Sequence, residues 1–320
     1  MSVTTIHKEP THWIVDHDRI VQFGELTGDR SGLHLDPEIG RQAGYGGAIA
    51  HGLLTACWAV GAITQTPYAS TPTGTSPGIQ STFSVRLGKV VCVGDQFITR
   101  ILDSDDRGIQ SSESPFQQTT RFETLNQHGE QTSSGELTVR PEGPLQDDAA
   151  PEPWDLRPWR NAQPDHIFDA DDLVRFGPRG TSLARVISDR DVAVFSNLLS
   201  PIRSDGQKGN PHSESKLDPQ IVPPMLSFSL AFSDFLRDLV SVRMPAQGFA
   251  GHIGDRWRLF RPIRVGERLH SCHQPLSIRP SKSREGMAIV HFGLQIMDGQ
   301  GRVVQDGETV MMIPIQSEKL

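Results

Sequence analysis

The 320-residue sequence has few cysteines, few aromatic residues and no excess of positive charge. Its three cysteines, Cys57, Cys92 and Cys272, are far apart, and no pair has metal-ligand spacing. We therefore expect a reduced, cytoplasmic protein without a disulfide framework. Lysine and arginine number 31 against 38 aspartates and glutamates, and the net charge of −7 argues against nucleic-acid or anionic-membrane binding. Aromatic residues are only 7% of the chain, too few for a base-stacking platform.

Signals for export, nucleotide binding and membrane insertion are also missing. The N-terminus lacks the apolar core of a secretion signal, and neither a Walker loop nor a strand followed by Gly-x-Gly-x-x-Gly is present. Residues 42–85 hold no charged side chain, and 46–63 approach the length of a membrane span. Glycines and a histidine interrupt that stretch, so we expect a helix buried on all sides within a soluble protein.

A polar, proline-rich stretch lies near the middle of the chain. Its prolines forbid regular structure and its polar residues can bury little, so it is interpreted as a linker. The length suits two domains of about 150 residues each. We predict a first domain over 1–140, the linker over 141–162 and a second domain over 163–320.

The two halves repeat each other weakly. Residues 15–26 align with 187–198, and 49–53 align with 222–226. Each half begins with an amphipathic helix, capped by Asp16 or by Ser188, and continues into a long apolar helix. Alternating strand-like runs follow at 83–95, 96–102, 117–123 and 135–140, then at 256–267, 268–278, 288–297 and 303–313. This predicts an α+β fold twice over, each half with an antiparallel sheet able to wrap its long helix.

The densest chemical signal is the turn-rich segment 26–38, which follows the first helix. Asp29 and His34 lie five residues apart in this loop, and both could face one small molecule. A carboxylate beside an imidazole is a general acid/base pair, in which one group takes a proton from water and the other delivers one to carbon. Asp36 precedes Pro37 and is interpreted as a structural helix cap.

Gly52 opens the long helix of the first half. Main-chain amides at a helix N-terminus can hold a carbonyl oxygen that gains negative charge, and glycine permits a ligand to approach closely. Close helix–sheet packing would explain this glycine equally well. The adjacent His51 is a candidate for substrate binding, with a hydrogen-bonded role in the core as the alternative.

One ordered string in the first half resembles the motif of the MaoC-like, (R)-specific enoyl-CoA hydratase (hydratase 2) family. Its residues are Phe23, Leu26-Thr27-Gly28-Asp29, Leu33-His34, Asp36, Ala43 and Ile49-Ala50-His51-Gly52. The resemblance implies a hot-dog fold, in which an antiparallel sheet wraps a long helix, and the repeat then implies a double hot-dog.

The resemblance also implies a reaction and roles for particular residues. Asp29 and His34 would activate one water, and the amide of Gly52 would polarise the thioester carbonyl. Water would add to a trans-2-enoyl thioester, or a (3R)-hydroxyacyl thioester would be dehydrated, as in fatty-acid or polyketide metabolism. No metal or redox cofactor is expected, because coenzyme A or an acyl carrier protein belongs to the substrate.

The sequence departs from the family motif at Ser31-Gly32, where the family usually has Asn-Pro. Serine keeps a smaller hydrogen-bonding group and glycine is expected to loosen the turn, which leaves Ser31 as a secondary substrate-binding candidate.

The second half has lost the motif. Its equivalent loop carries Arg203 in place of the histidine, and Met225 replaces the glycine of the long helix. Arg203 could bind phosphates of the acyl carrier or nucleotide, or form a surface salt bridge. We thus expect one site per chain and a pseudo-dimer within the chain, with further pairing of two chains left open. A hot-dog thioesterase, a specialised biosynthetic dehydratase and a non-catalytic acyl-thioester-binding protein remain alternatives.

Overall fold

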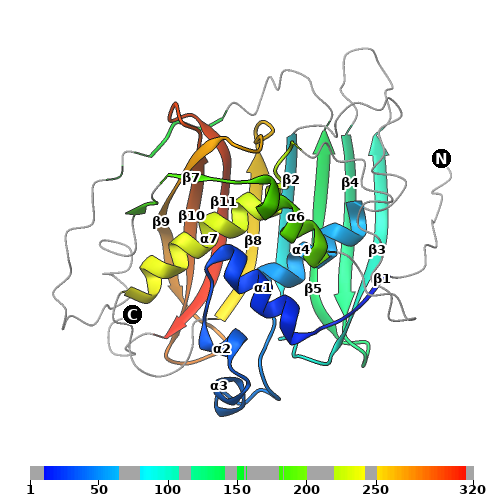
Figure 1. Cartoon of the computed structure of the whole chain (residues 1–320). Helices are drawn as coiled ribbons and strands as arrows, with labels where there is room; N and C mark the ends of the chain where they lie inside the picture. Colours follow the sequence, from blue (N-terminus) through cyan, green and yellow to red (C-terminus); the bar gives the residue numbers. More distant parts are fainter. Residues whose placement is uncertain are drawn as a thin grey trace. The chain divides into compact units, whose positions relative to one another are not determined.

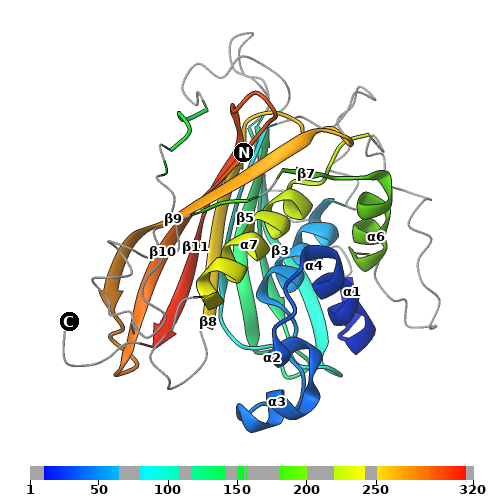
Figure 2. The same cartoon turned by 60° about the vertical axis from the view of Figure 1, so that its left-hand side comes forward.

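The computed structural model describes residues 11–64, 80–107, 117–140, 150–154, 156, 180–182, 184–199, 220–241 and 251–314. The chain divides into two compact units (Figures 1 and 2). Unit 1 comprises 1–146 and 189–221, and unit 2 comprises 147–188 and 222–320.

Unit 1 contains an antiparallel sheet whose strands run in the order β1-β3-β4-β5-β2. The strands are β1 (Thr11–Ile14), β2 (Gln80–Leu87), β3 (Gln96–Arg107), β4 (Gln117–Leu125) and β5 (Gln131–Arg140). The alternating runs predicted for the first half overlap β2 to β5, but the run at 83–95 continues past the end of β2 at Leu87. The short edge strand β1 escaped prediction, because four residues give too little alternation to recognise.

The helices of unit 1 are α1 (His17–Thr27), α2 (Gly32–Leu35), α3 (Pro37–Gln42), α4 (Gly52–Thr64) and α6 (Asp189–Leu199). Helix α4 packs on β3 and β4, and its residues 53–59 are all buried, as expected for the uncharged stretch. Rings fill the space between helix and sheet: Phe97 meets Trp13 at 6.0 Å and Trp58 at 5.6 Å between ring centroids. All three rings are fully buried, so they contribute apolar packing between α4 and the sheet.

Two of the predicted helix caps are present in unit 1. Asp16 accepts the Arg19 main-chain N–H at 2.8 Å at the start of α1. Asp36 accepts the Glu38 N–H at 2.8 Å, and Pro37 is the first residue of α3. The structural interpretation of Asp36 is therefore confirmed.

Unit 2 repeats the layout. Its sheet runs β8-β11-β10-β9-β6, with β7 also paired to β9, and the long helix α7 packs on β9 and β10 (Figure 1). Its elements are β6 (Gly180–Thr181), β7 (Arg185–Val186), α7 (Pro224–Ser241), β8 (Gly251–Leu259), β9 (Arg268–Pro280), β10 (Met287–Met297) and β11 (Val303–Pro314).

Two segments do not follow the predicted division of the chain at the linker. Helix α6 follows the linker in the sequence but packs on α1 and α4 in unit 1, where Trp58 Nε1 donates to the Leu198 carbonyl at 2.9 Å. Most of the predicted linker, 141–162, lies outside the described residues. Its described part is attached to unit 2, since the Trp154 N–H donates to Gln295 Oε1 at 3.0 Å.

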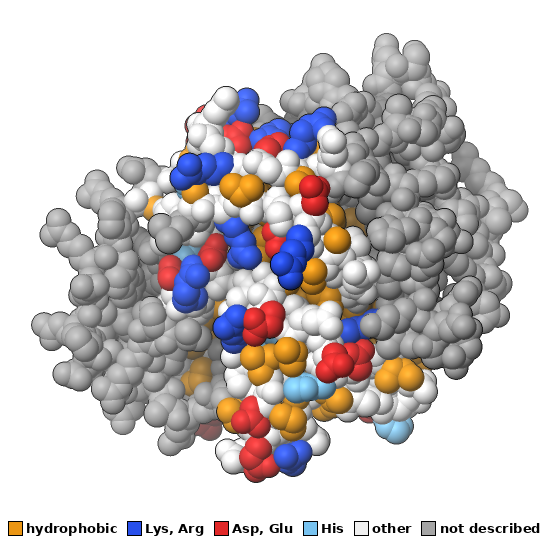
Figure 3. All heavy atoms as spheres, in the orientation of Figure 1, with side chains coloured by type: hydrophobic (Ala, Val, Ile, Leu, Met, Phe, Trp, Pro, Cys, Tyr) orange, Lys and Arg blue, Asp and Glu red, His pale blue; other side chains and the backbone are white. Residues whose placement is uncertain are grey.

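Charged side chains of both signs are interspersed on the face drawn in Figure 3. Two arginines in and just after β8 form ion pairs: Arg258 contacts Asp306 at 2.7 Å, and Arg261 contacts Glu267 at 2.9 Å. Cys57, Cys92 and Cys272 are all free thiols, as expected. No helix in the described part of the chain is long and apolar enough to cross a membrane.

Candidate active site

The loop after α1 is held from within. Gly28 ends the helix with a left-handed φ of 96°, a conformation that suits glycine. Thr27 Oγ1 donates to the Phe23 carbonyl at 2.8 Å and accepts the Asp29 N–H at 3.3 Å. These contacts fix the position of the Asp29 backbone directly after the helix.

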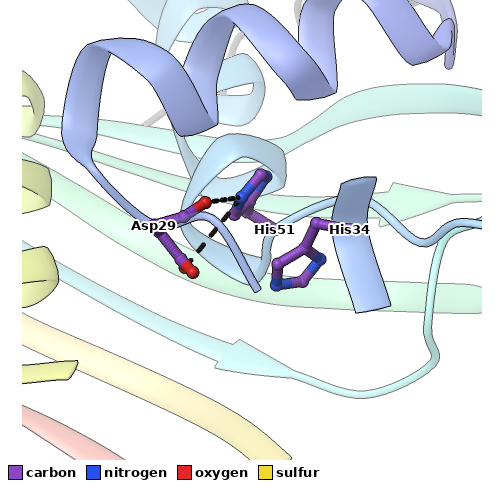
Figure 4. Close-up of side chains that lie close together, drawn as sticks. All are labelled: Asp29, His34 and His51. Atoms are coloured by element: carbon purple, nitrogen blue, oxygen red, sulfur yellow. Dashed lines mark hydrogen bonds and ion pairs between the residues drawn. The ribbon is translucent and has the colours of Figure 1, made fainter. Parts of the chain in front are cut away.

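The Asp29 carboxylate lies at the edge of the core, with its side chain 10% exposed. Its Oδ1 accepts the Ser31 N–H at 3.4 Å, and its Oδ2 lies 4.0 Å from Nε2 of His51. Oδ1 thus contacts the loop and Oδ2 faces His51; the dashed lines in Figure 4 join His51 to Oδ2 and to the main-chain oxygen of Asp29.

His34 lies on the short helix α2 and is half-buried. Its Nδ1 donates to the Ile49 carbonyl at 2.9 Å. Ile49 is itself fixed, because its N–H donates to the Leu33 carbonyl and it forms a β-bridge with Cys92. This contact assigns the proton of a neutral ring to Nδ1 and makes Nε2 the nitrogen that can accept a proton.

His51 completes the cluster from the start of α4. It is 2% exposed, its Nε2 donates to the Asp29 main-chain oxygen at 2.9 Å, and its ring lies 3.8 Å from that of His34 (Figure 4). Burial, and then the neighbouring His34, lower the pKa of His51 well below its usual value, although the hydrogen bond to Asp29 opposes this. His51 is therefore neutral at pH 7.

Gly52 follows His51 and is the first residue of α4. The first N–H groups of a helix have no partner within the helix, and the helix dipole favours negative charge beside them. Chain connectivity therefore brings a main-chain donor close to the cluster of Asp29, His34 and His51.

The cluster has the residue types of a cation site. One ligand atom from each of Asp29, His34 and His51 lies within 4.8 Å of the others. Nε2 of His51, however, is already used on the Asp29 main-chain oxygen, and the two rings lie over each other with a tilt of 30° rather than converging on a point. This arrangement suits proton transfer better than a ligand set of two imidazoles and a carboxylate.

The remaining site candidates have different positions. Ser31 precedes α2 and is exposed, while its carbonyl accepts the His34 N–H at 3.0 Å. Gly32 begins that helix and its carbonyl accepts the Asp36 N–H at 2.9 Å, so the turn is helical here rather than loosened. Arg203 lies outside the described residues.

One residue of this site escaped the sequence analysis. A Cβ atom at Gly24 would lie 2.8 Å from the Asp29 main-chain oxygen and 3.6 Å from Nε2 of His51. The available signal was a glycine in the middle of an amphipathic helix, which costs stability and calls for a packing reason.

The corresponding helix of unit 2 begins differently. Pro224 is the first residue of α7, and Met225, the counterpart of Gly52, is buried and accepts a contact from Trp257 Nε1 at 3.3 Å. Residues 200–219, which contain the counterpart of the Asp29–His34 loop, lie outside the described part of the chain. The loss of the motif from this loop stays a sequence prediction.

Residues 3–126 match the family model described as MaoC like domain. No curated protein sequence matches the chain significantly. Among solved structures, the chain is similar to a protein from Chloroflexus aurantiacus described as a MaoC domain dehydratase. That similarity has a TM-score of 0.63 and 14% identity, over 96% of this chain and 93% of the other.

A second similar structure is a conserved protein from Mycobacterium tuberculosis that is described as having a double hot-dog fold. Its TM-score is 0.62 at 14% identity, over 98% of this chain and 96% of the other. A third, described as a MaoC-like dehydratase, has a TM-score of 0.58 at 13% identity, over 96% of each chain. Together with the family match, these similarities show a double hot-dog fold that carries a MaoC-like domain over residues 3–126.

Proposed function

We propose that this protein hydrates trans-2-enoyl thioesters and dehydrates (3R)-hydroxyacyl thioesters, at one site in unit 1. The observation that carries the proposal is the placement of Asp29 and His34 together beside the first residue of α4. The match of residues 3–126 to the MaoC like domain supports the same class of reaction.

The two side chains divide the proton transfers between them. A water held by Asp29 and by Nε2 of His34 loses a proton to one of these groups as its oxygen bonds to C3 of the substrate. The other group, which carries a proton at the start, delivers it to C2, and the proton taken from water then replaces it. Both groups return to their starting states, one water is added in total, and the conjugated double bond is consumed. Because both groups belong to one cluster, both additions take place on the same face of the double bond.

The thioester carbonyl needs a donor where negative charge develops during addition. The N–H of Gly52 is the main-chain group that the start of α4 offers for this role. A glycine side chain also leaves room for the carbonyl to approach the backbone.

The substrate would bring its own carrier, either coenzyme A or an acyl carrier protein. The steps above are proton transfers and one carbon–oxygen bond, so the proposal assigns no metal or redox cofactor. Fatty-acid or polyketide metabolism would supply such thioesters.

The direct test follows the absorbance of conjugated thioesters when purified protein is mixed with a panel of trans-2-enoyl-CoAs. We expect absorbance loss without thiol release, and a decrease in kcat of about 10²- to 10⁴-fold in Asp29→Asn and in His34→Ala. Unit 2 offers a matched control in Asp255, a buried carboxylate 2.8 Å from Nε2 of His252. Asp255→Asn should lower stability and leave kcat within about threefold of wild type.

Other outcomes would contradict the proposal. Thiol release that depends on Asp29 would make the protein a thioesterase. Binding of the thioesters without turnover would make it an acyl-thioester-binding protein.

A further inference from the structure

His51 is the most buried group of the cluster, yet the proposed proton transfers leave it without a role. Its Nε2 points at the main chain of Asp29 rather than outward (Figure 4). Its Nδ1 is buried and has no hydrogen-bond partner among the described residues. A buried polar group that leaves one nitrogen unsatisfied costs stability, which calls for a reason to keep a histidine here.

The contacts of His51 connect three segments that are separate in the sequence. Its ring packs on Phe23 of α1 at 5.0 Å between centroids and on His34 of α2 at 3.8 Å. Its hydrogen bond at 2.9 Å reaches the carbonyl of Asp29 in the loop between those helices. One side chain at the start of α4 thus contacts both proposed catalytic residues.

We propose that His51 is a positioning residue: its hydrogen bond to the Asp29 carbonyl and its ring contact with His34 hold these two groups at the separation that one water requires. The inference deepens the proposed function and rests on it. His51 itself neither accepts nor donates the transferred proton.

The ring must remain neutral to do this. Asp29 and His34 are the titratable groups that lie against the ring among the described residues, and Phe23 and Gly24 of α1 are its neutral neighbours. A protonated His34 repels a second positive charge at 3.8 Å, and burial penalises that charge further. A neutral His51 leaves His34 as the imidazole that can become charged during turnover.

The surroundings are built to admit this ring and its bond. The site of a Cβ atom at Gly24 would lie 2.8 Å from the Asp29 oxygen that accepts from His51. A larger residue at position 24 would displace that oxygen or the backbone of α1. The glycine at position 24 therefore leaves room for the hydrogen bond between His51 and the Asp29 carbonyl.

Three variants test the role by kinetics. His51→Phe keeps a ring and removes the donor, and we expect kcat to fall about 10²-fold while KM changes less than about threefold. His51→Gln places an amide donor where Nε2 was and should recover at least tenfold of that loss. The matched control is His273→Phe in unit 2, since His273 is 1% exposed and its ring lies against Phe235 at 5.6 Å.

The control separates positioning from bulk stability. His273→Phe should lower the free energy of unfolding and leave kcat within about threefold of wild type. The proposal is overturned if His51→Phe retains its kcat, or if both variants lose kcat in proportion to their loss of stability.

Two measurements that need no turnover keep this inference distinct from the proposed function. Long-range proton–nitrogen NMR should show His51 as the neutral Nε2–H tautomer from pH 8 to pH 6. In His51→Phe, hydrogen exchange of the Arg30 and Ser31 amides should accelerate relative to the turn at Asn126. A protein that meets both expectations but turns over no thioester would refute the proposed function alone, whereas a protonated His51 at pH 6 or unchanged exchange would refute the positioning role.

Discussion

The two units share a layout but fill it with different residues. Trp13 in β1 pairs with Phe97 in β3, and Arg185 in β7 pairs with Leu269 in β9 at the same place in the repeat. The alignment of the two halves that places Gly52 opposite Met225 also places Trp58 opposite Ala231. The three aromatic rings between α4 and the sheet of unit 1 therefore correspond to an arginine, a leucine and an alanine in unit 2.

The consequence is a difference in packing behind the helix. In unit 1 the ring of Phe97 contacts those of Trp13 and Trp58, and all three rings are fully buried. In unit 2 a small cavity lies at this place, lined by Arg185, Ala231 and Leu269 together with Asp234 and Ser271. A catalytic group set on a helix terminus needs a helix that cannot shift, so close packing of α4 fits a site at its first residue.

The largest effect should come from breaking the ring cluster. Trp58→Ala removes both the ring and the hydrogen bond to the Leu198 carbonyl, and we expect a loss of about 3–5 kcal/mol in the free energy of unfolding. Urea denaturation followed by circular dichroism measures it. Trp58→Phe keeps a ring and loses only the bond, so it should cost about 1–2 kcal/mol. Equal losses in the two variants would show that the bond to α6, rather than the packing, matters.

The starts of the two long helices suggest a second test. Gly52→Pro gives α4 the residue type that begins α7 and removes the proposed donor, while proline is tolerated at the first position of a helix. We expect kcat to fall about 10²- to 10³-fold with little change in KM.

Gly52→Ala, which keeps the N–H, is the control for this substitution. Its kcat should remain well above that of Gly52→Pro. If the two variants have the same kcat, the N–H of residue 52 is not the group that polarises the carbonyl.

The hairpin turns of the two sheets differ in charge. In the β4–β5 turn of unit 1, Asn126 Oδ1 accepts the N–H groups of His128 and Glu130. In the β10–β11 turn of unit 2, Asp298 Oδ1 accepts those of Gln300 and Arg302, and its Oδ2 accepts from Arg261 at 3.0 Å. Burial would raise the pKa of Asp298, but the hydrogen bonds from Arg302, Arg261 and Gln300 outweigh it and hold this pKa far below its usual value.

The depressed pKa of Asp298 predicts that the stability contributed by its turn depends on pH. An aspartate with a depressed pKa stabilises the fold above its unfolded pKa of about 3.9, and that contribution is lost as the pH falls below it. Asp298→Asn should cost about 2–3 kcal/mol at pH 7, and its difference from wild type should shrink as the pH falls from 4 to 2. Trp58→Phe in unit 1, measured in the same urea titrations, removes a hydrogen bond from a neutral side chain to a main-chain oxygen, so its cost should not follow the titration of Asp298. A constant cost of Asp298→Asn across this range would show that the carboxylate is not ionised in the fold.

Local signals predicted most of the fold. Asp16 and Asp36 act within two or three residues of themselves, and alternation along a strand is visible in the sequence of that strand alone. The pairing of Asp29 with His34 was also accessible, because only five residues separate them and the resemblance to a known motif covers both.

Contacts between distant segments were not accessible in the same way. The bond from His51 to the Asp29 carbonyl joins residues 22 apart, and the bond from Trp58 to Leu198 joins residues 140 apart. The acceptor in both contacts is a main-chain oxygen. Because every residue has one, the acceptor cannot be recognised from a pattern of side chains. The place of α6 in unit 1 depends on the second contact, and the sequence alone therefore assigned that helix to the second half.

The smallest effect should come from making unit 2 resemble unit 1. Leu269→Phe places a ring where Phe97 stands in the repeat, next to the cavity that Ala231 and Arg185 line. Filling empty space without strain should raise the free energy of unfolding by about 0.5–1 kcal/mol, and kcat should not change. Leu269→Ala, which enlarges the cavity, should instead cost about 2–5 kcal/mol. A loss of 1 kcal/mol or more in Leu269→Phe would mean that polar groups such as Ser271 and Asp234 reject the ring. The polar residues that line the cavity of unit 2 would then be incompatible with an aromatic cluster like that of unit 1.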